Sequence, residues 1–313
     1  MVSNLPQQID EKLICGLENS EDGAVYELDS ENYLVSTLDF FSPNISDPYT
    51  FGLIAAANAL SDIFAMGGEI LYALNILSFP SEVEEEAITE ILKGAIHNVN
   101  KAGGVVVGGH TTKNNEIVYG LSVTGKVKRK SIMLNSNAKV NNKIILTKKI
   151  GTGIYMSELS KGSDDYKEVV ESMTTLNKEA ADIMMNYNVS TCTDLTGFGL
   201  IGHLSEVAVA SDLSLNIYFD KLPLFDRTLE LVNNTNGGML RNIEHFSKYV
   251  NYENIKKENI NILADPQTSG GLFIFVDEQD ADELLKELQD KGITQARVIG
   301  ETIEKGDSFI NIL

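Results

Sequence analysis

Residues 34–39 (LVSTLD) are rich in β-branched side chains, and Leu34, Ser36 and Leu38 alternate with Val35, Thr37 and Asp39. This alternation predicts a β-strand. Residues 48–66 are small and apolar nearly all round, which is typical of a helix buried closely against a sheet. The Asp-Pro pair at 47–48 supplies an N-cap and a first helical residue, and Gly-Gly at 67–68 supplies a stop signal. We therefore predict one helix over residues 48–66.

One carboxylate stands near the end of this predicted helix. Asp62 would face the negative end of the helix dipole and would lose water on burial, and both effects disfavour its charge. A bound cation would offset both penalties. The alternative is that Asp62 accepts hydrogen bonds from a neighbouring loop, and the helix alone does not distinguish the two interpretations.

Similar patterns predict the remaining elements. In the first part of the chain they indicate strands at 24–28, 71–77 and 117–127, and a buried strand that runs from 103 into the glycine pair at 108–109. They also indicate helices at 6–17 and 82–102, and Ser81 is the expected N-cap of the helix at 82–102. In the second part they indicate strands at 143–147, 214–219, 272–276 and 297–301, and helices at 164–187 (with Ser163 as a candidate cap), 199–210 and 278–291. The polar stretch 128–142 separates the two parts, so we expect an N-terminal domain at 1–130 and a C-terminal α+β domain at 131–313.

Composition excludes several classes of protein. Of the 313 residues 43% are apolar, yet no run approaches the roughly 18 apolar residues of a membrane span, and the polar start is unlike a signal peptide. We therefore expect a cytoplasmic protein. Two cysteines, Cys15 and Cys192, are too few for a disulfide framework or a paired-cysteine zinc site. The net charge of −20 argues against nucleic-acid binding, although divalent cations can join carboxylates to nucleotide phosphates.

Four short clusters carry candidate chemistry, and each also has a purely structural interpretation. The acidic pair at 21–22 either solvates a turn or presents oxygens to a cation. The glycine pair at 108–109, before His110, either lets backbone amides approach a phosphate or forms a turn. The segments 193–204 (TDLTGFGLIGHL) and 265–271 (DPQTSGG) join an acidic residue to glycines. The first resembles an anion-binding helix start, and both could be sharp loops.

Taken together and in this order, the clusters resemble one family, selenophosphate synthetase (selenide, water dikinase). The resemblance extends from Asp22 to the end of the chain. The wider superfamily, which includes thiamine-monophosphate kinase and a hydrogenase maturation factor, shares the Ser-Asp…Met-Gly-Gly element but not the set of Asp-Phe-Phe, Gly-Phe-Gly and Pro-Gln-Thr-Ser-Gly-Gly motifs. The matching segments are DGAVY at 22–26, DFFSP at 39–43, IAAANALSDIFAMGG at 54–68, GGHT at 108–111, DLTGFG at 194–199 and DPQTSGG at 265–271.

The resemblance implies a reaction in which ATP, selenide and water yield selenophosphate, AMP and orthophosphate. It also implies the two-domain α+β fold of the aminoimidazole ribonucleotide synthetase-like superfamily. In that fold the β-rich N-terminal domains of a homodimer share a barrel near the bound ATP, and the C-terminal domain is an α/β sandwich. Matched by position, Asp22, Asp62 and Asp194 are the expected Mg²⁺ ligands. The expected ATP-binding residues are Glu21, where the family usually has Asp, with Asp39, Asp62, Gly108, Gly109 and His110.

The family also begins with a glycine-rich segment that carries a catalytic cysteine or selenocysteine and, three residues on, a lysine. Here Met1 stands where that segment would end, and neither Cys15 nor Lys12 matches it, so the resemblance assigns no catalytic residue in this chain. We expect that the natural polypeptide is longer, and that the 313-residue form binds Mg-ATP but makes little or no selenophosphate. Two alternatives stay open: a small-molecule kinase of the same superfamily, or an ATP-binding paralogue without catalysis.

Overall fold

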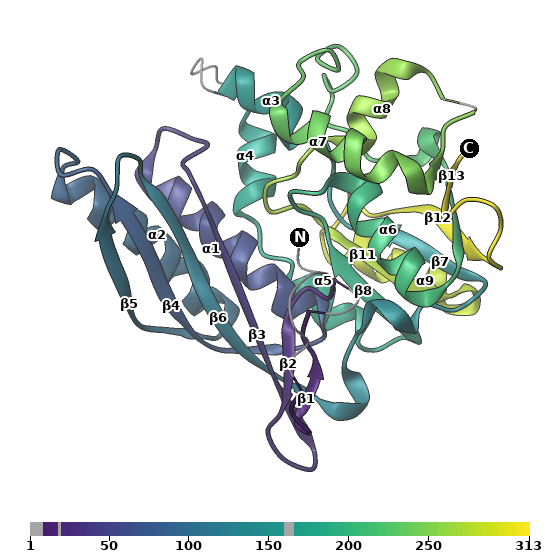
Figure 1. Cartoon of the computed structure of the whole chain (residues 1–313), viewed down its shortest axis with the longest axis horizontal. Helices are drawn as coiled ribbons and strands as arrows, with labels where there is room; N and C mark the ends of the chain where they lie inside the picture. The colour runs from purple at the N-terminus through teal and green to yellow at the C-terminus, as the bar shows by residue number, and fades with distance from the viewer. Residues whose placement is uncertain (1–8, 18–19, 160–165, 254) are drawn as a thin grey trace. The chain divides into compact units, whose positions relative to one another are not determined.

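In the computed structural model the chain forms two units, each built on a sheet of its own (Figure 1). The presence of helices and strands in both units confirms the predicted α+β class. Within the described part of the chain, no helix combines the length and hydrophobicity needed to cross a membrane. The structure describes residues 9–17, 20–159, 166–253 and 255–313. The N-terminal unit comprises residues 1–132 with 174–178, and the C-terminal unit comprises 133–173 with 179–313.

Six strands form the N-terminal sheet in the order β1-β2-β3-β6-β4-β5. All neighbouring pairs are antiparallel except β4 and β5, which run parallel because helix α2 connects them. The strands predicted at 24–28, 34–39, 71–77 and 117–127 are confirmed. The observed bounds are β1 (Leu13–Cys15), β2 (Ala24–Glu27), β3 (Asn32–Phe41), β4 (Glu69–Phe79), β5 (Val105–Lys113) and β6 (Val118–Lys128).

Helices α1 (Pro48–Ala65) and α2 (Glu85–Ala102) lie along one face of this sheet (Figure 1). Helix α1 starts as predicted, because the Asp47 carboxylate accepts the Thr50 N–H at 2.8 Å and Pro48 is its first residue. The helix is buried on nearly all sides, as its small apolar residues predict. The alternation of β3 turns its odd-numbered residues toward this helix, as the buried Val35 shows.

Helix α2 begins three residues later than predicted, and Ser81 is not its N-cap. The Val83 N–H donates to the Pro80 carbonyl at 3.3 Å and closes a turn, and Glu84 occupies the cap position without a side-chain hydrogen bond. Serine stabilises turns as well as helix starts, so the local sequence does not choose between the two. Gly103, at φ +96°, ends the helix in the left-handed conformation that glycine favours.

The predicted helix over residues 6–17 is wrong from residue 9 on, and residues 1–8 lie outside the described part of the chain. Residues 13–15 form β1, which pairs antiparallel with β2, and Ile9 is 93% exposed. Cys15 is buried, as predicted. The apolar spacing suits a short helix, but the open edge of β2 offers a ladder of hydrogen bonds, and a helix of this length is marginal without packing.

Strand β5 is the exposed edge of the sheet, not the buried strand that its apolar residues predict. The side chains of Val105 and Val107 are 52% and 57% exposed. The glycine pair at 108–109 lies inside this strand, at an irregularity in its pairing with β4, and does not form a separate loop. Hydrophobicity alone does not tell whether a strand takes a central or an edge position, because that depends on which strands pair.

Seven strands form the C-terminal sheet in the order β10-β13-β9-β12-β7-β11-β8. The pairs β10/β13 and β13/β9 are parallel and the others are antiparallel. The four strands predicted in this half are confirmed, whereas β8, β10 and β13 have no counterpart among the predictions. The observed bounds are β7 (Asn142–Leu146), β8 (Val189–Asp194), β9 (Ser214–Ile217), β10 (Val250–Asn251), β11 (Leu272–Asp277), β12 (Arg297–Ile303) and β13 (Ile310–Ile312).

The helices of this half confirm two predictions and correct one. Helices α6 (Gly199–Ser211) and α9 (Glu278–Asp290) lie where predicted. The single helix predicted over 164–187 is two, because the chain leaves helical conformation at 175–177, and Ser163 lies outside the described residues. The other helical elements are α3 (Thr152–Leu159), α4 (Lys167–Thr174), α5 (Lys178–Met184), α7 (Gly237–Phe246), α8 (Lys257–Ala264) and the short 3₁₀ helices η2 (Arg129–Ser131), η3 (Asn135–Asn137), η5 (Phe219–Lys221) and η6 (Ser247–Tyr249).

The core of the C-terminal unit lies between its sheet and helices α6, α7 and α8. Ile144 and Leu146 of β7 point into this core with Phe273 of β11. Ile145, which alternates with them, is equally buried but on the opposite side, and helix α9 contacts β7, β11 and β12. The sheet is therefore covered on both faces, which agrees with the expected α/β sandwich.

Candidate active site

Two of the predicted carboxylates accept hydrogen bonds across the contact between β3 and α1. The hydroxyl of Thr37 donates a short hydrogen bond to Asp62 Oδ2, and Asn58 Nδ2 donates to Asp39 Oδ2 at 2.7 Å. Asn58 and Asp62 are one helical turn apart on α1, and the two β3 residues are two apart on the strand, so each pair projects from a single face. The strand-to-helix packing thus brings Asp39 beside Asp62, although 22 residues separate them in the sequence.

Burial governs the electrostatics of this pair of carboxylates. It raises the pKa of Asp39 to about 6, against the opposing effect of the Asn58 hydrogen bond. Asp62 is 7% exposed and lies in the last turn of α1, where the helix dipole is negative. Two acidic groups held together with little water fit a divalent cation, because its charge would favour the ionised form of both.

Asp22 lies just before the strand that neighbours β3 in the same sheet. It stands two residues before β2, whose first residue, Ala24, pairs with Ser36 of β3. A Cβ atom at the intervening Gly23 would lie 3.2 Å from the Ser36 carbonyl and 3.4 Å from the Met66 sulfur. The chain at Asp22 therefore runs beside β3 and the end of α1. Glu21 and Asp22 are both half-buried.

The predicted nucleotide residues of β5 have a backbone that only glycine adopts easily. Gly108 and Gly109 have φ of +149° and +154°. A Cβ atom at Gly109 would lie 2.3 Å from the Asn75 carbonyl, and Asn75 Nδ2 donates to the Gly108 carbonyl at 3.2 Å. His110, the next residue, is exposed. The glycines therefore have a structural role in the β4–β5 pairing, and their backbone lies at an open sheet edge.

Asp194 belongs to the C-terminal unit, at the end of β8. It is 1% exposed and lies close to the Lys148 ammonium group, which donates to the Ser269 carbonyl at 3.0 Å. Burial lowers the pKa of Lys148 to about 7, and the charge of Asp194 opposes that shift. The expected third metal ligand is therefore a buried carboxylate with a buried amine beside it.

The two glycine-rich motifs of the second half contact each other. The Leu195 N–H donates to the Gly271 carbonyl at 2.9 Å, and the Gly270 N–H donates to the Leu195 carbonyl at 3.0 Å. The Gln267 N–H donates to the Thr196 carbonyl at 2.9 Å. The segment 265–271 thus holds the loop that follows Asp194, a relation that the sequence does not reveal because some 70 residues separate the motifs.

Asp265 and Gln267 also fix the start of α3. Asp265 Oδ2 accepts the Gly153 N–H at 3.0 Å, and Gln267 Oε1 accepts the Gly151 and Thr152 N–H groups at 2.9 and 3.0 Å. Burial raises the pKa of Asp265 to about 7. The backbone amides at the start of α3 therefore donate to side chains of this chain. The glycine-containing loop at 151–153 thus has a structural role.

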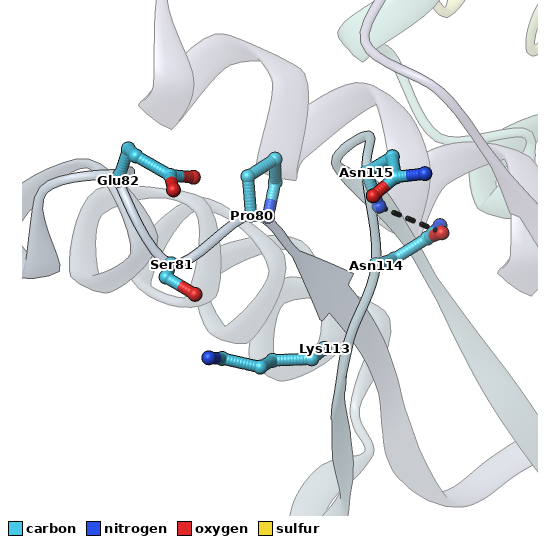
Figure 2. Close-up of a pocket in the computed structure, with 6 residues that line it drawn as sticks. All are labelled: Pro80, Ser81, Glu82, Lys113, Asn114 and Asn115. Atoms are coloured by element: carbon cyan, nitrogen blue, oxygen red, sulfur yellow. Dashed lines mark hydrogen bonds between the residues drawn. The ribbon is translucent and has the colours of Figure 1, made fainter.

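A surface pocket of about 300 Å³ lies elsewhere in the N-terminal unit, where β4 and β5 end (Figure 2). It contains none of the predicted site residues. Its lining is mostly polar, and Figure 2 shows the Lys113 side chain extended beside it. The lining residues are Pro80, Ser81, Glu82, Lys113, Asn114 and Asn115.

The sequence interpretation missed four residues that contact or orient the predicted ligands: Thr37, Asn58, Lys148 and His203. Asn58 could have been found, because it precedes Asp62 by four residues and so shares its helix face. The other three act across strand pairings or loops that only the fold defines. Of the expected metal ligands, Asp22 and Asp62 belong to the N-terminal unit and Asp194 to the C-terminal unit, and their convergence stays a prediction.

Comparison with known proteins identifies the family. The N-terminal domain model of AIR synthase related proteins matches residues 20–127, and the C-terminal model matches 139–312. The chain is 41% identical to "Selenide, water dikinase" of Clostridioides difficile over 320 residues, which cover all of this chain and 92% of that protein. The chain belongs to the selenide, water dikinase family. The family member of Caldanaerobacter subterraneus is 42% identical over 308 residues, with 96% and 89% of the two chains covered.

Solved structures with the same fold extend the comparison beyond the selenide, water dikinase family. Thiamine monophosphate kinase of Aquifex aeolicus superposes with a TM-score of 0.67 over 93% of this chain and 90% of its own, at 17% identity. Hydrogenase maturation protein HypE in complex with ATP gives a TM-score of 0.68 over 91% and 80%, at 14% identity. At these identities the likeness shows the fold alone, which is the expected two-domain fold.

Proposed function

We propose that this protein catalyses the ATP-dependent synthesis of selenophosphate from selenide, with release of AMP and orthophosphate. The observation that carries the proposal is the similarity along the entire chain to a protein named selenide, water dikinase, at 41% identity. The buried pair Asp39 and Asp62 supports it independently, because adjacent carboxylates of this kind suit a cation that binds nucleotide phosphates.

Mg²⁺ and ATP are the proposed cofactor and substrate. Asp22, Asp62 and Asp194 would hold Mg²⁺, which would neutralise phosphate oxygens during transfer. Asp62 fits this role because its neighbours are already arranged: Thr37 orients one of its oxygens. We assign ATP binding to Asp39 in β3 and to Asp62 in α1. We also assign it to four residues elsewhere in the same unit: Glu21, Gly108, Gly109 and His110.

The residues of the chain would contribute mainly position and electrostatics. Asn58 and Thr37 hold the Asp39 and Asp62 carboxylates before any ligand arrives, so little reorganisation is needed on binding. Burial of α1 excludes water from around them. The Lys148 ammonium compensates part of the charge of Asp194 in the same way.

A homodimer is the proposed assembly, because the sheet face opposite α1 and α2 carries apolar side chains. Leu38 and Phe40 of β3 are each 51% exposed. The strand register places Leu38 in one row with Leu74 of β4, and Tyr72 in one row with Val105 of β5. Exposed apolar side chains gathered on one face of a sheet indicate an interaction surface. A second copy that adds its own sheet would give the shared barrel that the family resemblance implies.

Calorimetric titration of Mg-ATP tests the ligand assignment. Asp62→Asn should weaken binding about tenfold or more, because the amide removes the negative charge that holds the cation. Glu116→Gln, an exposed acidic residue of the same unit, is the matched control and should bind normally. Equal affinity of the wild type and Asp62→Asn, with both proteins folded, would contradict the assignment.

Product analysis tests the reaction. Purified protein is incubated with ATP and selenide, and the nucleotide product is identified. Selenide-dependent formation of AMP supports the proposal. Selenide-independent ADP formation with phosphorylation of thiamine monophosphate would favour the superfamily kinase instead. Tight ATP binding without any turnover would favour the non-catalytic paralogue.

A further inference from the structure

His203 faces the loop that carries Asp194. It lies on α6 in the C-terminal unit and is 6% exposed. Its Nε2 atom is 3.1 Å from the Thr196 backbone nitrogen and 3.2 Å from the Thr196 hydroxyl oxygen. One nitrogen of the ring also lies within 4.8 Å of an Asp194 carboxylate oxygen. A histidine so near a proposed metal ligand can be a second ligand or can act through the loop, and the hydrogen bonds distinguish these roles.

The contact with Thr196 determines which nitrogen of the His203 ring carries the proton. A backbone N–H only donates, so Nε2 must accept it and carries no proton itself. In the neutral ring the proton then sits on Nδ1, which is 3.6 Å from Glu206 Oε2. Because an imidazolium ring has a proton on both nitrogens, acceptance at Nε2 also means that the ring is neutral. The Nε2 lone pair is therefore used by the protein, and Nδ1 carries the proton near the Glu206 carboxylate.

We propose that His203 is a positioning residue for Asp194: it binds the Thr196 amide and so fixes the loop that begins at the carboxylate, without itself binding the metal. This inference rests on the proposed role of Asp194 as a Mg²⁺ ligand. The chemistry of the ion agrees, because Mg²⁺ prefers oxygen ligands to imidazole nitrogen.

The loop is held from several directions, and His203 supplies the contact from α6. The segment 265–271 binds the backbone of Leu195 and Thr196 from the side of the sheet. Gly199, at φ +68°, lies so close to the Ala264 backbone that a Cβ atom would be 2.9 Å from it. The Phe198 ring lies 5.6 Å from that of His203. Loss of the imidazole acceptor would leave the Thr196 N–H unpaired beside Asp194, which favours movement of the loop.

A matched pair of substitutions separates the two roles. His203→Gln keeps an acceptor oxygen for the Thr196 amide, whereas His203→Leu removes it. The measurement is the Mg²⁺ concentration that half-saturates ATP binding. His203→Leu should raise it about tenfold or more, as outer-shell changes at metal sites do, and His203→Gln should stay within about threefold of the wild type by the same argument. His245→Gln, on the exposed side of α7, is the control and should be unchanged.

Nitrogen NMR of the four histidine side chains provides a readout that a general loss of stability would not move. Comparison with His203→Gln assigns the His203 resonances. We expect a protonated Nδ1 and a bare Nε2, with no coordination shift when Mg²⁺ or Co²⁺ is added. A protonated Nε2, or a nitrogen that coordinates Co²⁺ directly, would overturn the inference. This test uses the wild type, so it remains decisive if His203→Leu fails to fold.

Asp194→Asn separates failure of this inference from failure of the proposed function. If Asp194→Asn raises the Mg²⁺ requirement and folded His203→Leu does not, the positioning role is wrong and the ligand role stands. If both histidine variants lose Mg²⁺ binding equally, His203 acts as a ligand. If Asp194→Asn leaves the requirement unchanged, the ligand role of Asp194 is wrong and the inference about His203 fails with it.

Discussion

Several ionisable side chains with shifted pKa values lie in or beside the motifs that the sequence singles out. Burial raises the pKa of Asp39 and Asp265 and lowers that of Lys148 and His203. Strongly perturbed groups of this kind often mark functional sites, but structural networks produce them too. Both cases occur in this protein: Asp39 binds Asn58, one helical turn from the proposed ligand Asp62, whereas Asp265 binds a helix start within its own unit.

The pKa of Asp39 predicts how nucleotide binding depends on pH. Since that pKa is about 6 in the free protein, a fraction of Asp39 is protonated below pH 6 and must lose its proton when a cation binds. Mg-ATP affinity should therefore fall as the pH decreases from 7 to 5, by up to about tenfold per pH unit below the pKa. Asp39→Asn removes this group, so titration calorimetry of the variant isolates its effect from the protonation of ATP itself. Identical pH profiles for the two proteins would contradict the prediction.

Asp265 predicts a pH dependence of stability. Its pKa is about 7 in the folded protein against 3.8 for an unperturbed aspartate, so the folded form binds more protons between these values. The free energy of unfolding should therefore decrease as the pH rises from 4 to 7, by roughly 1.4 kcal/mol or more in total. The amide introduced by Asp265→Asn would mimic the protonated carboxyl, so this variant should show a flatter profile in urea unfolding at several pH values. A wild type that becomes more stable relative to Asp265→Asn over this range would refute the account.

At the scale of elements, the packing of α1 on α2 depends on two glycines. A Cβ atom at Gly52 would lie 2.0 Å from the Ile91 carbonyl, and one at Gly94 would lie 2.1 Å from the Tyr49 carbonyl. The two helices thus approach backbone to backbone, at a distance that no other residue allows. This contact sets the position of α1, and with it the position of Asp62 against β3.

Gly94→Ala should separate these helices. We expect it to reduce the free energy of unfolding by roughly 2–3 kcal/mol, as overpacking does, despite the higher helix propensity of alanine. Chemical denaturation measures this loss. Gly306→Ala is the control, since a Cβ atom there would approach only the Ser214 hydroxyl oxygen, at 3.7 Å. Wild-type stability of Gly94→Ala would show that the helices adjust at little expense.

At the scale of the whole molecule, the two units differ in how completely their sheets are covered. The C-terminal sheet has buried residues on both faces, whereas the N-terminal sheet packs against α1 and α2 on one face and, among the described residues of its unit, has exposed apolar side chains on the other. The apolar residues of its other face include Leu38 and Phe40 of a central strand. A second copy that covers this face would remove these apolar side chains from water.

Charge on this face should therefore prevent dimer formation. We expect the wild type to be a dimer by light scattering and Leu38→Glu to be a monomer at micromolar concentration, because the carboxylate would be buried in the interface. Leu240→Glu places the same charge on an exposed leucine of α7 and should leave the mass unchanged. A monomeric wild type, or a dimeric Leu38→Glu, would contradict the proposed assembly.

The sequence by itself determined the elements whose signals are local. Asp47 and Pro48 define the start of α1, alternation defines β3, and the motifs that contain Asp39, Asp62 and Asp194 identify the family. These features depend on neighbouring residues or on residue identities, which the sequence contains directly. The same reasoning failed for residues 13–15 and for the edge position of β5, because strand partners are distant in the chain.

Only the tertiary structure decided which side chains serve the predicted carboxylates. Thr37 contacts Asp62 because β3 packs on α1, and the segment 265–271 holds the loop after Asp194 because β11 pairs with β8. His203 contacts Thr196 because the loop before α6 turns back along the side of the helix that carries the imidazole, which the seven-residue spacing alone does not reveal. The physical reason is the same in each case: hydrogen bonds between distant segments form only after the apolar faces have packed, and residue spacing carries no record of that packing.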